Sequence, residues 1–200
     1  FYAGRTAELV TAEMRRGGGL ITSEDLAAYQ PAWRKPVRFT YRGDTVLSMP
    51  PSSSGGVTLA LIAGILEGYD LGAIQWHSAR HLHLLTEAFR RAYADRNAVL
   101  GDPDFVTMPL ARLTSKEYAA ERRATISLDR ATPSRDVGPG ASTTAENPHT
   151  THFSVVDSAG NAVAVTTTIN SFYGIRAVVE GAGFLLNNEM DDFSAKPGSP

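Results

Sequence analysis

Hydrophobic residues follow a helical spacing through the first two-thirds of the chain and an alternating spacing from residue 150 onward. A period of 3.6 residues places apolar side chains on one helix face, whereas strict alternation is typical of a half-buried strand. Two strand-like runs joined by Arg42-Gly43-Asp44 predict a hairpin within residues 36–51. The predicted helices are 2–16, a short segment after Thr22, 57–68, 76–100 and 115–124.

Capping and breaking residues give the first two helices their ends. The glycines from Gly17 to Gly19 follow the first helical run and predict its C-terminus. Thr22 followed by Asp25 resembles a capping box, in which the side chain of each residue accepts a hydrogen bond from the backbone of the other. Pro31 ends the short helix that follows, because proline cannot continue a helix.

Residues 127–149 interrupt both patterns. They contain three prolines, two glycines and almost no large apolar side chain, so they predict a long irregular linker. The alternating pattern that follows predicts two strands joined near Asp157–Asn161, with Gly160 in the turn. Shorter strands are predicted within 177–186, and a polar loop from residue 187.

The change of pattern divides the chain into two regions. The region 1–149 is helix-rich and ends in the linker, and the region 150–200 is β-rich and starts at Thr150. This composition of elements predicts a mixed α/β (α+β) fold with a flexible joint before Thr150. The chain begins with Phe1 rather than Met, and a helical pattern follows at once, so we expect a fragment of a longer or processed protein.

Composition excludes several classes of function. A formal net charge of −2 over 200 residues gives no support for nucleic acid or an anionic membrane surface as a partner. No apolar run approaches the ~20 residues that a membrane-spanning helix needs. The chain has no cysteine, which excludes disulfides, thiolate metal sites and a cysteine nucleophile.

Two threonines, Thr150 and Thr151, stand where the linker ends and the first strand of the β-rich region begins. A threonine hydroxyl is a weak nucleophile unless a base removes its proton, and one such base is the α-amino group of the same residue. Cleavage of the His149–Thr150 bond frees that amine, whose ordinary pKa of about 7.7–8.0 leaves it partly neutral near pH 7. The same pattern suits ordinary strand threonines, so these residues alone leave both interpretations open.

Several other candidates have plainer interpretations. His77, His81 and His83, with an acidic residue nearby, suggest a zinc site, but the His-Glu-x-x-His order is absent and a helix face explains them better. The acidic run "NNEMDD" lacks the spacing of an EF-hand calcium loop. His152 is close to the threonines, but the freed amine already supplies a base, so we expect a structural role. We predict no metal and no cofactor.

Five longer stretches are distinctive in both content and order: "GGLITSEDLAAYQP", "YRGDTVLSMPPSSSGG", "AYADRNAVLGDPDF", "TTHFSVVDSAGNAVAVTTTIN" and "LLNNEMDDFSAKPG". Together they resemble the signature segments of the γ-glutamyltranspeptidase family, along all 200 residues. Ordered matches of this kind are far more specific than one short motif. The resemblance implies the αββα sandwich of N-terminal-nucleophile hydrolases, incomplete in this chain.

The resemblance assigns the nucleophile. Thr150 matches the threonine that self-cleavage after His149 exposes at the start of the family's small subunit. Thr168 matches a second threonine, which hydrogen-bonds the nucleophile and assists processing. The chain thus corresponds to the end of the large subunit and the start of the small one.

The resemblance also assigns a substrate-binding set. Asn170 matches an asparagine at the α-carboxylate or amino end of the γ-glutamyl group, and Glu189 and Asp192 match the acidic pair that binds the α-amino group. Carboxylates suit this purpose because an ammonium group carries a positive charge and three hydrogen-bond donors.

The function implied by the resemblance is transfer or hydrolysis of γ-glutamyl groups from glutathione-like donors, through a γ-glutamyl-threonine ester, to an amino acid, a peptide or water. It also implies a large/small subunit heterodimer and a periplasmic or secreted location. The family's carboxylate-binding arginine and oxyanion donors match nothing in this chain, so we expect the chain alone to be inactive. The alternatives are a cephalosporin acylase, a poly-γ-glutamate-processing relative, and a non-catalytic fragment or interaction module.

Overall fold

The structure, a computed structural model, describes residues 1–138 and 150–192. These residues fall into two compact units, one made of 1–32 with 150–192 and the other of 33–138. The sequence-based division at residue 150 marks the predicted cleavage between His149 and Thr150. The two compact units do not test this cleavage, so the division remains a prediction. No helix in the described ranges is long and apolar enough to cross a membrane.

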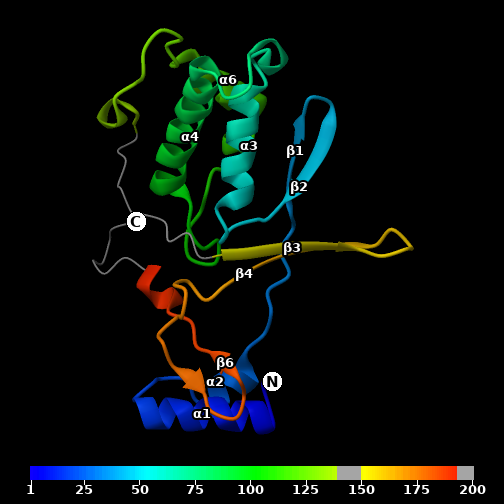
Figure 1. The fold of residues 1–200 in the computed structure, drawn as a ribbon, viewed down its shortest axis with the longest axis vertical. Coiled ribbons are helices and arrows are strands. Elements are labelled where there is room, and N and C mark those ends of the chain that lie inside the picture. The colour runs from blue at the N-terminus through cyan, green and yellow to red at the C-terminus, as the bar shows by residue number, and fades with distance from the viewer. Residues whose placement is uncertain (139–149, 193–200) are drawn as a thin grey trace. The chain divides into compact units, whose positions relative to one another are not determined.

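The unit of residues 33–138 is built from helices and one hairpin. Its elements are β1 (Val37–Tyr41), β2 (Asp44–Ser48), α3 (Gly55–Leu66), η1 (Leu71–Ala73), α4 (Ala79–Val99), α5 (Leu110–Leu113), α6 (Lys116–Ala124) and η2 (Ser134–Asp136). Helices α3, α4 and α6 lie beside one another, and the antiparallel β1–β2 hairpin lies along α3 (Figure 1). The predicted hairpin is confirmed, with Arg42 and Gly43 in its turn.

The core of this unit lies between α3, α4 and α6. Ile65 of α3 and Leu84 of α4 are fully buried, and Ala119 of α6 is nearly so. A β-carbon on Gly64 would lie 2.7 Å from the Ala119 Cβ, so the missing side chain lets α6 approach α3 closely. Because the interior is close-packed, helix contacts of this kind depend on small residues at the crossing point.

A buried ion pair on α4 anchors the segment that follows α6. Glu87 and Arg91 are almost completely buried, and Arg91 Nη1 donates to Glu87 Oε2 at 2.6 Å. Thr132 donates to the same carboxylate through its backbone N–H, at 2.9 Å, and through its hydroxyl, at 2.6 Å. Arg91 Nη2 also donates to the carbonyl of Thr125 at 2.7 Å. The described part of the predicted linker is therefore irregular, as expected, but firmly attached to α4.

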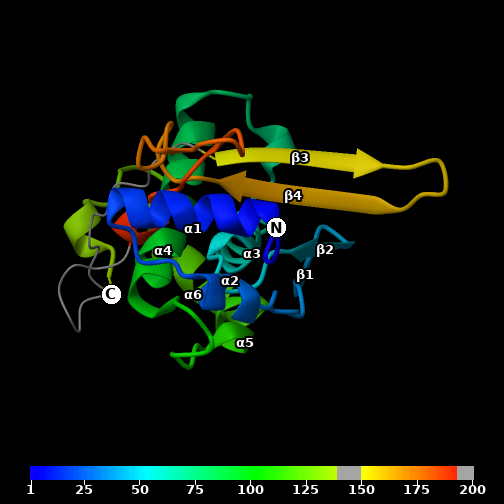
Figure 2. The ribbon, with the colours of Figure 1, turned by 90° about the horizontal axis from the view of Figure 1, so that it is seen from below.

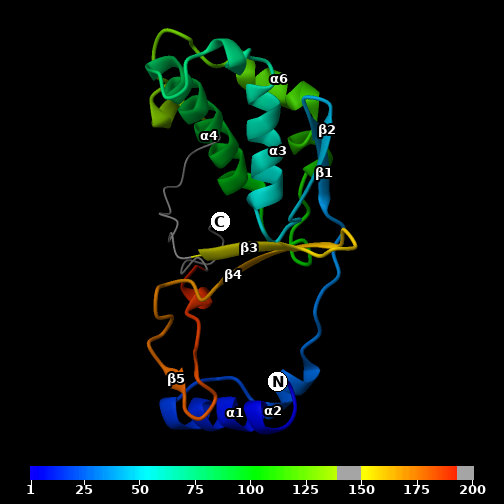
Figure 3. The same cartoon turned by 45° about the vertical axis from the view of Figure 1, so that its right-hand side comes forward.

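The other unit combines two helices with two antiparallel strand pairs, one of seven-residue strands and one of two-residue strands. Its elements are α1 (Arg5–Gly17), α2 (Ser23–Ala28), β3 (Thr150–Val156), β4 (Ala162–Thr168), β5 (Val178–Val179), β6 (Phe184–Leu185) and η3 (Glu189–Asp192). The β5–β6 segment lies beside α1 (Figure 3), where Val179 is fully buried. The β3–β4 pair is a long ribbon (Figure 2), and most of its side chains are exposed.

The predicted C-terminal end of α1 and the predicted N-terminal capping box of α2 are confirmed. Gly18 takes a left-handed conformation, with φ 72°, and its N–H donates to the carbonyl of Met14 as a C-terminal cap. Thr22 and Asp25 form the predicted capping box: the Asp25 N–H donates to Thr22 Oγ1 at 3.2 Å, and the Thr22 N–H donates to Asp25 Oδ2 at 2.8 Å. These caps satisfy backbone groups that a helix end leaves without internal partners.

The helix predicted over 76–100 begins three residues later in the structure, where α4 covers Ala79–Val99. The helix begins at Ala79, because the Ser78 hydroxyl accepts a hydrogen bond from the His81 N–H at 3.2 Å and caps it. His77 precedes the helix and has a positive φ of 58°. The short helix α5 and the 3₁₀ turns were not predicted, because three or four residues are too few to show a period.

Candidate functional site

The β3–β4 hairpin brings the two candidate threonines of the site together. In its register Thr150 faces Thr168, and His152 faces Thr166. Directly opposed residues of an antiparallel pair have Cα atoms roughly 4.5–5.5 Å apart. The predicted pairing of these strands is confirmed. His149, the residue before the candidate cleavage point, lies outside the described residues.

The turn of this hairpin is fixed by Asp157. Its Oδ1 accepts hydrogen bonds from the N–H groups of Ala159, at 2.9 Å, and Asn161, at 2.8 Å. The Asn161 side chain donates to Oδ2 at 2.7 Å, and these bonds together lower the pKa of the Asp157 carboxyl. Gly160 has φ 83°, a conformation that glycine adopts without steric cost. The local sequence thus fixes the register that places Thr168 opposite Thr150.

The chain leaves β4 in a compact turn that holds Asn170. The Thr168 Oγ1 accepts a hydrogen bond from the Asn170 N–H at 2.9 Å. Asn170 is 5% exposed and has φ 69°, in the left-handed region that asparagine tolerates better than most residues. Its Nδ2 donates to the carbonyl of Asn188 at 3.0 Å. The side chain of Asn170 is therefore held by the segment that carries the candidate acids.

That segment ends in the 3₁₀ helix η3, which begins at Glu189 and ends at Asp192. A 3₁₀ helix has three residues per turn, so positions 189 and 192 lie on the same side of it. The Glu189 N–H donates to Asn187 Oδ1 at 2.9 Å, and the Asp191 N–H donates to the Asn188 carbonyl at 3.0 Å. The backbone therefore places positions 189 and 192 one turn apart in a segment that is hydrogen-bonded to Asn170 through Asn188.

Asn188 is the residue of this region that sequence reasoning missed. It is half-buried and hydrogen-bonds both the turn after β4 and the 3₁₀ helix. Its only sequence signal is its place in the polar run "NNEMDD", where every residue looks equally suited to a surface loop.

His152 has partners that suit the structural role expected for it. Its Nδ1 lies 2.7 Å from the Thr166 hydroxyl, and its Nε2 lies 3.3 Å from the Ser154 hydroxyl. Since strand residues two apart share a face, position 152 lies on the same face of β3 as position 150. These contacts support the register of the hairpin close to the candidate nucleophile.

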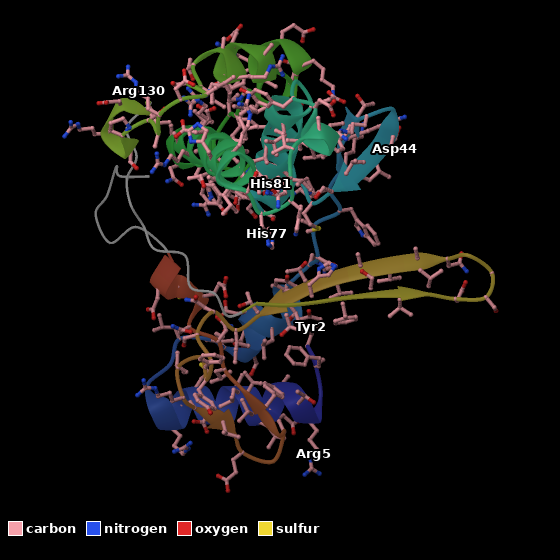
Figure 4. The ribbon with its side chains drawn as sticks, turned by 45° about the horizontal axis from the view of Figure 1, so that its top comes forward. Tyr2, Arg5, Asp44, His77, His81 and Arg130 are labelled. Carbon is pink, nitrogen blue, oxygen red and sulfur yellow. The ribbon has the colours of Figure 1, made fainter. Side chains whose placement is uncertain are left out.

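The histidines that suggested zinc have other partners. The His81 ring is buried and lies 4.6 Å from the ring of Trp76, and His83 Nε2 lies 2.7 Å from the carbonyl of Ser127. Figure 4 shows His77 and His81 close together beside the start of α4. Within residues 1–138 and 150–192, no three His, Cys, Asp or Glu side chains are grouped as metal ligands.

A cavity of about 440 Å³ lies in the unit of residues 33–138. Apolar and polar side chains line it, including Tyr69, Asp70 and Arg80. None of the candidate site residues contributes to its wall.

Comparison with solved structures gives the class of protein. A cephalosporin acylase from Bacillus halodurans matches with a TM-score of 0.79 and 26% identity, over 100% of this chain and 34% of that chain. A γ-glutamyltranspeptidase from Helicobacter pylori matches with a TM-score of 0.67 and 46% identity, over 70% of this chain and 40% of that chain. The fold is therefore that of the N-terminal-nucleophile hydrolases, incomplete in this chain, as the sequence predicts.

Comparison of sequences then gives the family. The family described as "Gamma-glutamyltranspeptidase" matches residues 1–200. The "Glutathione hydrolase proenzyme" of Escherichia coli (strain K12) is 50% identical over 200 residues, which are 100% of this chain and 34% of that protein. The chain belongs to the γ-glutamyltranspeptidase family. It spans about a third of the length of the curated relatives that it matches.

Proposed function

We propose that the full-length protein containing this chain transfers or hydrolyses γ-glutamyl groups, with Thr150 as its nucleophile. The observation that carries the proposal is the register of the β3–β4 hairpin, which sets Thr150 opposite Thr168 at the first position of a strand. Family membership supports the same assignment. The donor class is γ-glutamyl compounds such as glutathione, and the acceptor is an amino acid, a peptide or water.

The first chemical step is self-cleavage. The Thr150 hydroxyl attacks the carbonyl carbon of His149, and the acyl group moves from the Thr150 nitrogen to its oxygen. Water then hydrolyses this ester, which releases the His149 carboxylate and leaves Thr150 with a free α-amino group. That amine accepts the hydroxyl proton in later turnovers, as in other N-terminal nucleophiles.

Catalysis then proceeds through a second ester. The Thr150 oxygen attacks the γ-carbonyl of the donor, the leaving amine takes a proton, and a γ-glutamyl-threonine ester forms. An acceptor amine or water breaks the ester and regenerates the hydroxyl. Thr168 is well placed to position the nucleophile, because the Asn170 N–H fixes its Oγ1 at the strand end opposite Thr150.

The donor's α-amino group binds to the 3₁₀ helix in this proposal. Glu189 and Asp192, one turn apart, supply negative charge for the ammonium, and Asn170, in the turn after β4, donates a hydrogen bond to the segment that carries them. Charge-assisted hydrogen bonds to carboxylates are roughly twice as strong as neutral ones. The proposal includes no cofactor, a heterodimer of the two cleavage products and export from the cytoplasm.

Self-cleavage is the first test. Full-length protein incubated near neutral pH is expected to yield a new N-terminus that starts Thr-Thr-His-Phe, whereas the Thr150→Ala variant stays intact. Intact mass and N-terminal sequencing measure both. Thr151→Ala is the matched control, because it changes the neighbouring threonine and leaves the nucleophile. An uncleaved wild type, or cleavage at another bond, would refute the assignment.

An acylase activity is the second candidate, since a cephalosporin acylase shares this fold over the whole chain. A glutaryl group carries the same carboxylate as a γ-glutamyl group but lacks its α-amine. Glu189 and Asp192 favour a donor that has the amine, because an acidic pair repels a carboxylate that brings no compensating positive charge. Turnover of γ-glutamyl-p-nitroanilide against glutaryl-p-nitroanilide separates the two functions, and a preference for the glutaryl compound would favour the acylase.

A further inference from the structure

Asn188 connects the end of the nucleophile hairpin with the acidic 3₁₀ helix. On the hairpin side, its N–H donates to the Ile169 carbonyl at 3.3 Å, and its carbonyl accepts from Asn170 Nδ2 at 3.0 Å. Its side-chain Oδ1 accepts from the Ser171 N–H at 3.0 Å and from the Ser171 hydroxyl at 2.9 Å. Both the backbone and the side chain of Asn188 are thus bonded to the three residues after Thr168.

On the acidic side, Asn188 bonds to Asp191. Its Nδ2 donates to Asp191 Oδ2 at 2.8 Å, and its carbonyl accepts from the Asp191 N–H at 3.0 Å. These two bonds close the first turn of the 3₁₀ helix that carries Glu189 and Asp192. One residue therefore fixes this turn relative to the strand end.

The orientation of the Asn188 amide follows from its neighbours. The Ser171 backbone N–H is a donor only, so the atom of Asn188 that faces it must be the oxygen. The other side-chain atom is then the nitrogen, which matches the carboxylate of Asp191, an acceptor when ionised. Only a side chain with an acceptor on one side and a donor on the other fits here, and neither aspartate nor leucine provides both.

The contacts also distinguish the three acids of the turn. Asp191 is engaged by Asn188 through a charge-assisted hydrogen bond, so its carboxylate has a structural partner. Glu189 is exposed, and its backbone N–H is held by Asn187. The acid that Asn188 holds is thus different from the pair expected to bind the substrate amine.

The backbone beside Asn188 is tightly packed, which makes the connection stiff. Gly174 has φ 53°, and a β-carbon on it would lie 1.8 Å from the Leu186 carbonyl oxygen. The Ile175 N–H donates to that same carbonyl at 3.1 Å. A change at Asn188 therefore cannot be absorbed by free movement of the turn after β4.

We propose that Asn188 is a positioning residue, which sets the distance between the nucleophile end of the β3–β4 hairpin and the acids that bind the donor's α-amino group. The inference rests on the proposed function. In this role Asn188 does not contact the substrate and acts through Asn170 and Asp191, so it adds a residue to those of the proposed function. Loss of its link to the 3₁₀ helix should weaken binding of the amine more than it slows the chemical step.

The test uses the full-length processed protein and the variant Asn188→Asp. This change keeps an oxygen toward Ser171 but replaces the donor toward Asp191 by a second oxygen, so it breaks the side-chain link to the 3₁₀ helix and keeps the bonds to Ser171 and the backbone bond to the Asp191 N–H. We expect the KM for γ-glutamyl-p-nitroanilide to rise about 10-fold, the factor for loss of one hydrogen bond to a charged group, with kcat changed less than about 3-fold. Asn187→Asp is the matched control, because it adds the same charge one position earlier and keeps the acceptor for the Glu189 N–H.

Inhibition by two dicarboxylates separates positioning from general damage. L-Glutamate and glutarate differ by the α-amino group, so Asn188→Asp should weaken inhibition by L-glutamate about 10-fold and leave glutarate within about 2-fold. Equal weakening of both inhibitors, or no change in either, would overturn the inference.

A second variant covers the case in which Asn188→Asp does not fold. Asp191→Ala removes the other partner of the same hydrogen bond at an exposed position, and it should reproduce the selective loss of L-glutamate binding. A wild type without γ-glutamyl turnover would refute the proposed function and the inference with it. A wild type with turnover and unaltered variants would refute the inference alone.

Discussion

At the scale of single residues, the buried carboxylate of Glu87 shows how strongly partners decide the behaviour of a charged group. Burial raises the pKa of Glu87, but hydrogen bonds from Thr132 and Arg91 outweigh it, and the pKa lies below its ordinary value. The ionised form is therefore the one that the folded state favours. A carboxylate of this kind stabilises the fold only while it stays ionised.

The pH dependence of unfolding follows from that direction. The stability contributed by Glu87 is fully present above the unfolded-state pKa of about 4.3 and is lost as the pH falls through the lower folded-state pKa. Glu87→Gln should remove this part of the acid dependence. It should also lower the free energy of unfolding at pH 7 by about 3 kcal/mol, because it leaves Arg91 buried without its counter-charge.

Denaturant unfolding between pH 3 and pH 7 measures both effects. Glu117→Gln is the control, since Glu117 is an exposed acid on α6 in the same unit. A Glu87→Gln variant whose stability falls with acid as steeply as the wild type would show that Glu87 does not carry the dependence.

The candidate site was predictable where a local pattern fixes a register. Thr168 faces Thr150 because the Asp157–Asn161 turn is readable from its sequence, and a hairpin turn of known length determines which residues pair. Asn188 was not predictable, because its importance comes from Ser171, which is 17 residues away in the chain, and from the left-handed backbone of Asn170. Such partners are set by tertiary contact and leave no periodic signal.

At the scale of elements, the sequence predicted those that bury one face. Helices α1, α4 and α6 show a helical period because each packs one face against a neighbour. Helix α3 is apolar on nearly every side because most of its residues are buried, and the four residues of α5 are too few for a pattern. The residues after α6 were predicted as a loose linker on composition. The structure attaches Thr132 to Glu87 of α4 and the carbonyl of Gly138 to Arg122 of α6, and composition does not reveal these contacts.

This attachment predicts a local effect of Thr132→Val. The change keeps the shape of the side chain but removes the hydroxyl that donates to Glu87 and accepts from Arg91. Loss of one such bond, worth about 1 kcal/mol, should speed amide hydrogen exchange in residues 126–138 roughly 5-fold. Exchange in the core of α4 should change less, because the ion pair of Glu87 with Arg91 remains.

Ser134→Ala is the control for this experiment, because it removes an exposed hydroxyl from the same segment. Uniform acceleration across residues 33–138 in Thr132→Val would indicate global destabilisation and would contradict a local anchor.

At the scale of the whole molecule, the described residues 150–192 leave apolar side chains of the β3–β4 hairpin exposed. Phe153, Val155 and Val163 are each about half exposed or more. An isolated two-stranded hairpin is marginally stable in water, and three or more strands or a packed helix are needed for independent stability. The chain spans about a third of its relatives' length, so we expect the rest of the full-length protein to cover this hairpin and complete the sandwich.

Hydrogen exchange in the β3–β4 hairpin should differ between the 200-residue chain and the full-length protein. In the chain alone, amides of residues 151–167 should exchange within seconds to minutes, because a marginal hairpin opens at almost no cost in free energy. In the full-length protein the same amides should exchange at least ~10²-fold more slowly, since burial in a sheet ties their opening to wider unfolding. The chain alone should also show no γ-glutamyl turnover, because removal of a single oxyanion donor already costs ~10²–10³ in rate. Amides of α4 supply the internal reference, because their helix already packs on α3 in the described chain. Equal exchange of residues 151–167 in both proteins would contradict this prediction, because it would mean that the rest of the full-length protein does not cover β3 and β4.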